Sequence, residues 1–252
     1  LYKLFKLIRK FKPNVVQTWM YHADLIGGVI ARLAGIKNVF WNIRQTTLEP
    51  GKSKRATFFI AKLCAKLSKR VPKKIVCCAE KAVEVHGSIG YDTSKITVIS
   101  NGYDLSKLCV IPNSQAQLKK ELGDVFPLIG MVGRFDLQKD HFGLLEAFTI
   151  VKKTGISHKL VLVGLEINTS NIALIEKIQL LGLKDEVLLL DQRNDIPTIM
   201  NSLDLHVLSS SSEGFPNVLA EAMACNTPCV TTDVGDAALI VGDTGWVVPA
   251  KN

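Results

Sequence analysis

The sequence predicts an α/β protein made of two Rossmann-like domains in tandem, each built on a parallel β-sheet. The main observation is a regular alternation of short apolar segments, typical of buried strands, with longer segments of helical periodicity. Glycine, proline and polar residues separate these segments. Alternation of this kind favours parallel sheets with helices packed on both faces. A length of 252 residues with 47% hydrophobic residues is enough for two packed domains.

The alternation forms two series, joined by a stretch that is the best linker candidate, residues 110–114. In the first series we expect helices over 1–11, 24–34, about 54–70 and from Glu80, with strands over 15–20, 39–43, 75–79 and 96–100. In the second we expect strands over 128–132, 160–163, 187–190, 205–208, 229–231 and 246–248, with helices from His141, Asn171, Ile196 and about Asn217. The predicted domains are therefore 1–112 and 113–252. Because the chain opens inside a helix and stops after a strand, we expect the first domain to be incomplete and further helices to follow the second.

Charge divides unevenly between the two predicted domains. Residues 1–112 carry 20 Lys and Arg against 6 Asp and Glu, a net of +14, while residues 113–252 carry 11 against 17, a net of −6. A basic half suits nucleic acid, an anionic membrane surface or a phosphorylated acceptor. The sequence contains no nucleic-acid-binding motif, so nucleic acid is the least favoured partner.

One predicted helix, 54–70, carries its cations at helical spacing. Lys62, Lys66 and Lys69 recur every three to four residues and form a stripe. Such a stripe is typical of a solvated helix face, and also of a helix that rests on an anionic membrane. No apolar run reaches the 18 or so residues that a membrane-spanning helix needs, so we expect a cytoplasmic protein whose basic half contacts the inner face of the membrane.

The stretch from Ser209 to Cys225 predicts an anion-binding turn. A short buried strand ends at Leu208, serines and a glycine follow, and Pro216 precedes a run of good helix formers. Free backbone N–H groups and the helix dipole attract an anion such as a diphosphate at a helix start. Glu213 and Glu221 flank this position, and carboxylates suit the vicinal hydroxyls of a sugar. The plainer alternative is that Glu213 caps the helix and Glu221 is a solvated helix residue.

A second candidate anion site follows the strand at 128–132. Gly133 and Arg134 end this strand, and Lys139 lies five residues further on in a loop before a helix. Ligands bind at the carboxyl ends of strands in open parallel sheets, where an arginine fork and a lysine point charge would hold phosphate oxygens. Two unrelated surface cations are the alternative. No Asp-x-Asp metal motif is present in the sequence.

The segment Glu213–Cys225 resembles the signature of the retaining glycosyltransferases of family 4, which have the two-domain GT-B fold. The strand-Gly-Arg-x4-Lys pattern of residues 128–139 is similar to a pattern of the same family. The resemblance implies a UDP- or GDP-sugar donor, no other cofactor and no metal. It implies catalytic roles for Glu213, His22, Arg134 and Lys139. The implied donor-binding residues are Arg134, Lys139, Arg193, Glu213, Gly214, Phe215, Pro216, Asn217, Val218, Leu219 and Glu221.

The front half carries weaker parts of the same resemblance. Residues 16–24 correspond to a segment that often reads His-x-His, and here His22 is the histidine that remains. A lone histidine is more often structural. Residues 99–104 resemble an Asn-Gly-x-Asp turn that contains Asn101. His22, Arg44 and Asn101 are therefore the candidate residues on the acceptor side.

The resemblance implies transfer of a sugar, with retention, to a glycan or lipid-linked acceptor in cell-surface polysaccharide or glycolipid synthesis. The acceptor would attack from the front face, and the departing phosphate would accept its proton. The alternatives are another GT-B enzyme, such as a nucleotide-sugar epimerase or a sugar phosphorylase, and a module that binds nucleotide sugar without turnover. No Gly-x-Gly-x-x-Gly follows any predicted strand, which disfavours a Rossmann oxidoreductase.

Overall fold

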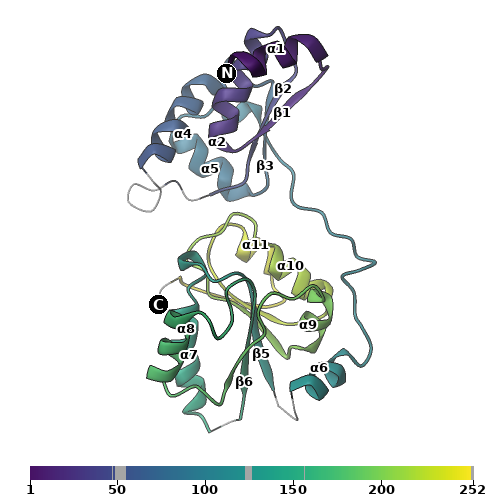
Figure 1. Ribbon diagram of the computed structural model, residues 1–252, viewed down its shortest axis with the longest axis vertical. Coiled ribbons are helices and arrows are strands. Elements are labelled where there is room, and N and C mark those ends of the chain that lie inside the picture. Colours follow the sequence, from purple (N-terminus) through teal and green to yellow (C-terminus); the bar gives the residue numbers. More distant parts are fainter. Residues whose placement is uncertain (47, 49–54, 123–126, 156, 251–252) are drawn as a thin grey trace. The chain divides into compact units, whose positions relative to one another are not determined.

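The computed structural model describes residues 1–46, 48, 55–122, 127–155 and 157–250, and divides into two compact units (Figure 1). The first unit comprises Leu1–Asn101 together with Glu213–Phe215. The second comprises Gly102–Ser212 and Pro216–Asn252. Each unit contains one parallel sheet; the first has one hydrophobic core cluster and the second has two among the described residues.

The first unit has a sheet of four parallel strands in the order β1-β2-β3-β4. Its strands are β1 (Val16–Trp19), β2 (Val39–Ile43), β3 (Lys74–Cys77) and β4 (Ile96–Val98). Its helices are α1 (Tyr2–Phe11), α2 (Met20–Ala23), the π-helical turn η1 (Asp24–Gly28), α3 (Val29–Leu33), α4 (Arg55–Ser68), α5 (Glu80–Ser88) and the 3-10 turn η2 (Thr93–Lys95). The strand order follows the chain, so right-handed crossovers place the connecting helices on one face of this sheet. Trp41, Ile43 and Ile75 are fully buried beneath them.

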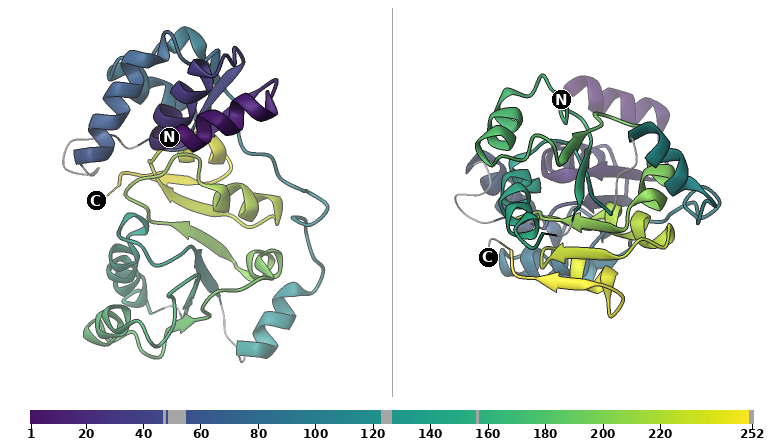
Figure 2. Two further views of the ribbon diagram at one scale, coloured as in Figure 1. Left: turned by 45° about the horizontal axis from the view of Figure 1, so that its top comes forward. Right: turned by 90° about the horizontal axis from the view of Figure 1, so that it is seen from below.

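The second unit has a sheet of six parallel strands in the order β10-β9-β8-β5-β6-β7. Its strands are β5 (Leu128–Val132), β6 (Lys159–Val163), β7 (Val187–Leu189), β8 (Leu205–Leu208), β9 (Cys229–Thr232) and β10 (Trp246–Val248). Its helices are α6 (Ser114–Leu122), the 3-10 turn η3 (Leu137–Lys139), α7 (His141–Lys152), α8 (Ile172–Leu180), α9 (Ile196–Ser202), α10 (Asn217–Ala224) and α11 (Ala237–Val241). In the right-hand view of Figure 2 its strands, coloured from green to yellow, lie side by side.

The winding of the second sheet reverses at β5. The chain runs outward from β5 to β6 and β7, then returns to β8 on the other side of β5. Right-handed crossovers therefore place α7 and α8 on one face and α9 to α11 on the other, as Figure 1 shows for the labelled helices. The point of reversal lies between β5 and β8. Ligands bind at such switch points in open α/β sheets.

The predicted α/β fold with two Rossmann-like domains is confirmed. β2, β5, β8 and β10 span the predicted residues, and α7, α9 and α10 begin where the sequence places them. Lys54, the predicted start of α4, lies outside the described residues. The helix expected over 24–34 begins earlier, at Met20, and contains the π-helical turn η1. Two adjacent glycines in η1, Gly27 and Gly28, lie close to β1 and β2, where a Cβ on Gly28 would meet Trp41 Nε1 at 2.4 Å.

The prediction missed helices α6 and α11. Residues 114–122 contain the helix formers Gln, Ala, Leu, Lys and Glu after a serine, which is a readable helix signal. The helix was not predicted because these residues follow directly on the expected linker, residues 110–114. Helix α11 has five residues, too few for a periodic pattern to be recognised.

Candidate functional site

The carboxyl ends of β5 and β8 lead into two turns that meet at the switch point of the second sheet. β5 pairs with β8 through Ile129 with Leu205 and Gly130 with His206. The first turn runs from Gly133 through η3 to the start of α7, and the second runs from Ser209 toward α10. Both turns contain residues that the sequence predicts to bind a diphosphate.

Two glycines let the backbones after β5 and β6 approach closely. The Gly133 N–H donates to the Val163 carbonyl at 2.8 Å. Gly164 has φ of 153°, and a Cβ there would lie 2.1 Å from the Gly133 carbonyl oxygen. A side chain at position 164 is therefore excluded by both backbone conformation and space. This contact fixes the path of the chain just before Arg134.

Both predicted cations lie in the turn after β5. The Arg134 guanidinium is 62% exposed and donates to Asp136 Oδ2 from Nε at 3.2 Å. The Lys139 side chain crosses Gly133, since a Cβ on that glycine would meet Lys139 Cε at 3.5 Å. Asp136 caps η3 through the Gln138 N–H, a bond that lowers the pKa of this carboxyl. Arg134 and Lys139 thus lie on a turn whose backbone is held by the side chain of Asp136.

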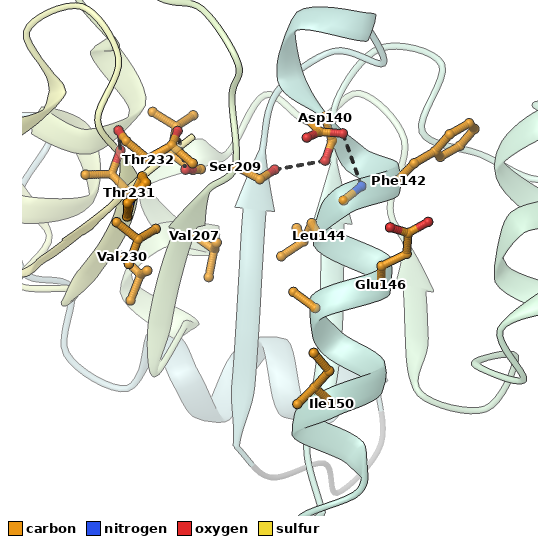
Figure 3. Close-up of a pocket in the computed structure, with 15 residues that line it drawn as sticks. Asp140, Phe142, Leu144, Glu146, Ile150, Val207, Ser209, Val230, Thr231 and Thr232 are labelled. Atoms are coloured by element: carbon orange, nitrogen blue, oxygen red, sulfur yellow. Dashed lines mark hydrogen bonds between the residues drawn. The ribbon is translucent and has the colours of Figure 1, made fainter. Parts of the chain in front are cut away.

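The turn after β8 is hydrogen-bonded directly to the turn after β5. Ser209 Oγ lies within hydrogen-bond distance of the carbonyls of Lys139, at 2.9 Å, and Asp140, at 3.2 Å. The Ser211 N–H donates to the Gln138 carbonyl at 2.7 Å. Figure 3 shows the Ser209 side chain directed at Asp140, whose carboxylate caps α7 through the Gly143 N–H. These contacts therefore hold the two halves of the candidate phosphate site in one arrangement.

Helix α10 supplies the helix start that the sequence predicts. Its N-cap residue is Pro216, which offers no side-chain acceptor to the first amides. These N–H groups and the helix dipole favour an anion at this end. Glu221 is half-buried on the same helix, and burial raises the pKa of its carboxyl. Asn217 Oδ1 accepts a hydrogen bond of 2.9 Å from Tyr103, a contact that the sequence did not indicate.

Arg193, one of the donor-binding residues that the resemblance implies, lies after β7. Its guanidinium is bound to the carboxylates of Asp195 and Glu121. These bonds raise its pKa, so it is a permanent cation with partners inside the protein.

The remaining candidate residues belong to the first unit. His22 is exposed on α2, immediately after the sharp turn at Met20, whose φ is 70°. Arg44 Nη1 donates a hydrogen bond to Asn101 Oδ1, so the structure brings these two candidates together. Glu213, Gly214 and Phe215 are grouped with this unit, whereas Pro216 to Glu221 belong to the second. The role of each remains a prediction.

Residues 107–252 match the model of the glycosyl transferases group 1 family, and residues 1–107 match that of glycosyltransferase family 4. This chain belongs to the group 1 glycosyltransferases. The predicted family is therefore confirmed.

Two bacterial members of this glycosyltransferase family are similar over almost the whole chain. The Escherichia coli UDP-Gal:alpha-D-GlcNAc-diphosphoundecaprenol alpha-1,3-galactosyltransferase is 29% identical over 93% of this chain and 61% of its own length. The capsular polysaccharide biosynthesis glycosyltransferase CapM of Staphylococcus aureus is 28% identical over 98% of this chain and 66% of its own length. The chain thus spans about two thirds or less of these two relatives.

The solved structures confirm the GT-B fold. HepE of Anabaena, determined in complex with UDP and glucose, superposes with a TM-score of 0.85 at 22% identity. The match covers 100% of this chain and 68% of HepE. At this identity the likeness concerns the fold.

Two buried histidines near Lys139 were missed by the sequence prediction. His141 begins α7 and His206 lies in β8, and they are 2% and 0% exposed. Burial and the nearby Lys139 ammonium lower the pKa of His141 to about 4 and of His206 to about 3. Both rings are therefore neutral near pH 7. In the sequence His141 follows Lys139 by two residues, whereas the proximity of His206 to Lys139 depends on how β8 pairs with β5.

A pocket of about 740 Å³ lies between α7 and the strands β8 and β9 (Figure 3). Asp140, Ser209, Thr231 and Thr232 line its polar part, while Ile150, Val207 and Val230 are among its apolar walls. None of the predicted donor-binding residues lines it.

The described residues contain no group of three or more His, Cys, Asp and Glu side chains placed to hold a metal ion. None of their helices is both long and apolar enough to cross a membrane.

Proposed function

We propose that this chain transfers a sugar, with retention, from a nucleoside diphosphate sugar to a glycan or lipid-linked acceptor in the synthesis of polysaccharides or lipid-linked glycans. The observation that carries the proposal is the pair of hydrogen-bonded turns at the switch point between β5 and β8. They bear Arg134 and Lys139 on one side and lead to the start of α10 on the other. Membership of the group 1 glycosyltransferases supports this assignment.

The donor is held by residues 113–252. Arg134 and Lys139 bind the diphosphate oxygens, together with the backbone amides at the start of α10. Glu221 accepts hydrogen bonds from the ribose hydroxyls, and Glu213 positions the transferred sugar with the backbone of Gly214 to Leu219. UDP is the first nucleotide to test, because the relative from Escherichia coli is named for UDP-Gal and HepE was determined with UDP.

In the reaction the bond between the anomeric carbon and the diphosphate oxygen breaks, and a bond from the acceptor oxygen to the same face of that carbon forms. The proton of the acceptor hydroxyl passes to the departing phosphate oxygen. Negative charge grows on the diphosphate as the bond breaks, and cations and helix amides fixed in advance stabilise it. This arrangement needs neither a metal nor another cofactor.

Residues 1–112 serve the acceptor. His22, Arg44 and Asn101 are the candidate contacts, and the Arg44–Asn101 hydrogen bond gives two of them a defined position. A lipid-linked acceptor is supported by the relative from Escherichia coli, which is named for a diphosphoundecaprenol acceptor.

The first unit also contacts an anionic membrane surface, at the cytoplasmic face where such an acceptor would be presented. Helix α4 combines an aromatic side chain that is 71% exposed, Phe59, with exposed cations at Arg55, Lys62 and Lys66. At 100° per residue these four side chains fall within one quarter of the helix circumference. An exposed aromatic ring among cations is typical of helices that rest at a lipid interface. The mixed face distinguishes α4 from a helix that is merely solvated.

Calorimetric titration tests the donor assignment. The chain is titrated with UDP, GDP and their sugars, in parallel with Glu221→Ala and the matched control Glu176→Ala, an exposed residue on α8. We expect one diphosphate to bind and the Glu221 change to weaken it by about 1–3 kcal/mol, through loss of charge-assisted hydrogen bonds. Absence of binding to every nucleotide by the folded chain would contradict the proposal.

Vesicle sedimentation tests the membrane contact. We expect the chain to sediment with vesicles containing phosphatidylglycerol and to stay in solution with phosphatidylcholine alone. The double change Lys62→Glu and Lys66→Glu should abolish sedimentation, whereas Lys184→Glu in an exposed turn of the second unit should not. Equal sedimentation of both variants would refute the assignment to α4.

A further inference from the structure

The exposed His22 lies on a turn of the first unit whose backbone is strained. β1 ends at Trp19 and α2 begins at Met20, whose φ is 70°. A left-handed backbone is unfavourable for a long side chain such as methionine, so it persists only where surrounding contacts fix it. α2 then continues into the π-helical turn η1. Both strained residues and π-helical turns are frequent at functional sites.

Tyr21 is the first anchor of this turn. Its side chain is 1% exposed, and its hydroxyl lies 2.9 Å from Nε2 of His86 on α5. His86 Nδ1 lies 2.7 Å from the carbonyl oxygen of Ala82, which can only accept, so Nδ1 carries the proton and Nε2 accepts from Tyr21. Burial lowers the pKa of His86 to about 4, so this arrangement of protons is kept near pH 7. From α4, Cys64 Sγ donates to the Tyr21 carbonyl at 3.4 Å.

Asp24 is the second anchor, on the same face of the helix as Tyr21. Residues three apart lie on one helix face, and Asp24 is fully buried. Its Oδ1 accepts a bond of 2.5 Å from Thr18 Oγ1 in β1, and its carboxyl also accepts from the backbone N–H of Asn42 in β2. The turn is therefore attached to two strands and two helices of the first unit.

The two anchors determine which side chain the turn exposes. His22 is about 100° around the helix from Tyr21 and points away from the buried face. Among residues 20–24 it is the one whose polar side chain is exposed. A network that only stabilised the core would not need a left-handed methionine beside it, since that conformation lowers stability. The fixed geometry instead serves the exposed imidazole.

We propose that Tyr21 and His86 are positioning residues for His22. The hydrogen bond between them fixes the rotation of α2 about its axis, so that the His22 imidazole is held in one direction toward the substrate. A side chain that is oriented in advance acts without the entropy cost of ordering it during the reaction. The inference rests on the proposed function, in which His22 is a candidate contact of the acceptor.

Nuclear magnetic resonance tests the positioning without relying on activity. The chain has five histidines, so selective ¹⁵N labelling gives five backbone amide signals, and His22→Ala identifies that of His22. We expect Tyr21→Phe and His86→Leu to lower the order parameter of the His22 amide from about 0.85 toward about 0.6. His86→Gln, whose side-chain oxygen accepts from Tyr21, should retain more order. The control Ser68→Ala removes another buried hydroxyl, which accepts from the Asp92 N–H at 2.9 Å, and should leave the His22 amide unchanged.

Hydrolysis of UDP-glucose and UDP-galactose tests the consequence for catalysis. In this reaction water replaces the acceptor: its oxygen bonds to the anomeric carbon, the bond from that carbon to the diphosphate breaks, and a proton passes to the departing UDP. We expect His22→Ala to lower kcat about 10-fold, and Tyr21→Phe to lower it about 5-fold with unchanged KM. Adding Tyr21→Phe to His22→Ala should change kcat less than about 2-fold, because residues that act as a unit are not additive. Thermal denaturation confirms that each variant is folded.

Three outcomes would overturn the inference. One is an unchanged order parameter of the His22 amide in Tyr21→Phe. Another is a wild-type kcat in Tyr21→Phe. The third is the same loss of kcat from Tyr21→Phe with and without His22, which would mean that the tyrosine stabilises the unit and does not act through His22. If wild type hydrolysed neither sugar nucleotide, the proposed function would fail, whereas the order parameters would still decide whether the Tyr21–His86 bond holds the turn.

Discussion

Ser209 Oγ lies 2.9 Å from the carbonyl oxygen of Lys139. A serine in the turn after β8 thus holds the backbone of a lysine in the turn after β5. These residues are 70 positions apart in the chain. They meet because β5 and β8 are neighbours in the sheet at its point of reversal. The hydrogen bond therefore connects the two halves of the candidate donor site.

Removing that hydroxyl should lower both stability and donor affinity. Ser209→Ala leaves the carbonyls of Lys139 and Asp140 without this donor, and we expect a loss of about 1 kcal/mol in the free energy of unfolding. Urea denaturation measures the first effect and calorimetry with UDP the second. Ser170→Ala, in an exposed turn before α8, is the control and should leave UDP affinity unchanged. A Ser209→Ala variant with wild-type affinity for UDP would show that this hydrogen bond does not support the donor site.

Removing either cation should weaken diphosphate binding. Arg134→Gln and Lys139→Met each delete charge-assisted hydrogen bonds worth about 1.5–3 kcal/mol, so we expect the Kd for pyrophosphate to rise at least 10-fold. The dependence of the Kd on salt concentration should also flatten, because fewer charges attract the anion. Lys153→Met, at the far end of α7, is the control. Unchanged pyrophosphate affinity in both variants would remove these residues from the site.

Asp24 should make the first unit less stable as pH rises. This carboxyl is fully buried, accepts a 2.5 Å bond from Thr18 Oγ1, and burial raises its pKa to about 7. The unfolded chain loses its proton near the ordinary value, whereas the native state retains it to about pH 7. The free energy of unfolding therefore falls over this window, by at most about 1.4 kcal/mol per pH unit, and the stabilisation is lost above it.

Asp24→Asn removes the titrating group and keeps an oxygen that accepts from Thr18. Urea unfolding at pH 5 and pH 8 should show this variant gaining stability relative to wild type at the higher pH. Glu84→Gln, an exposed acid on α5, should show no such gain. Parallel pH dependence of wild type and Asp24→Asn would contradict the prediction.

His206 should act in the opposite direction in the second unit. Burial lowers the pKa of this ring to about 3. The unfolded chain therefore binds a proton at this histidine near pH 6.5, whereas the native state does not. The contribution of His206 to the free energy of unfolding is therefore fully present above about pH 6.5. It declines as pH falls toward the folded pKa, by at most about 1.4 kcal/mol per pH unit. We expect His206→Leu to flatten the decline measured by urea unfolding between pH 7 and pH 5. His158→Leu, just before β6, is the comparison, and equal slopes in the two variants would refute this role for His206.

Local patterns in the sequence determined most of the secondary structure. The apolar runs at β2, β5, β8 and β10 are bounded by turn residues, and Pro216 before good helix formers marks the start of α10. These signals act over a few residues, so one sequence carries them in full. The Gly-Arg-x4-Lys pattern and the segment from Glu213 to Cys225 also determined the family, since the residues of each motif lie close together in the chain.

Tertiary structure decided which of these residues meet. Ser209 reaches Lys139, and Arg193 reaches Glu121, because strand order brings together turns that are distant in the chain. The same packing buries His206 and Asp24 and sets their charge state. Hydrogen bonding and desolvation depend on neighbours in space, and a strand pattern does not specify the order of strands in a sheet. The sequence therefore predicted Arg193 as part of the donor site, whereas the tertiary structure determined that the carboxylates of Asp195 and Glu121 bind it.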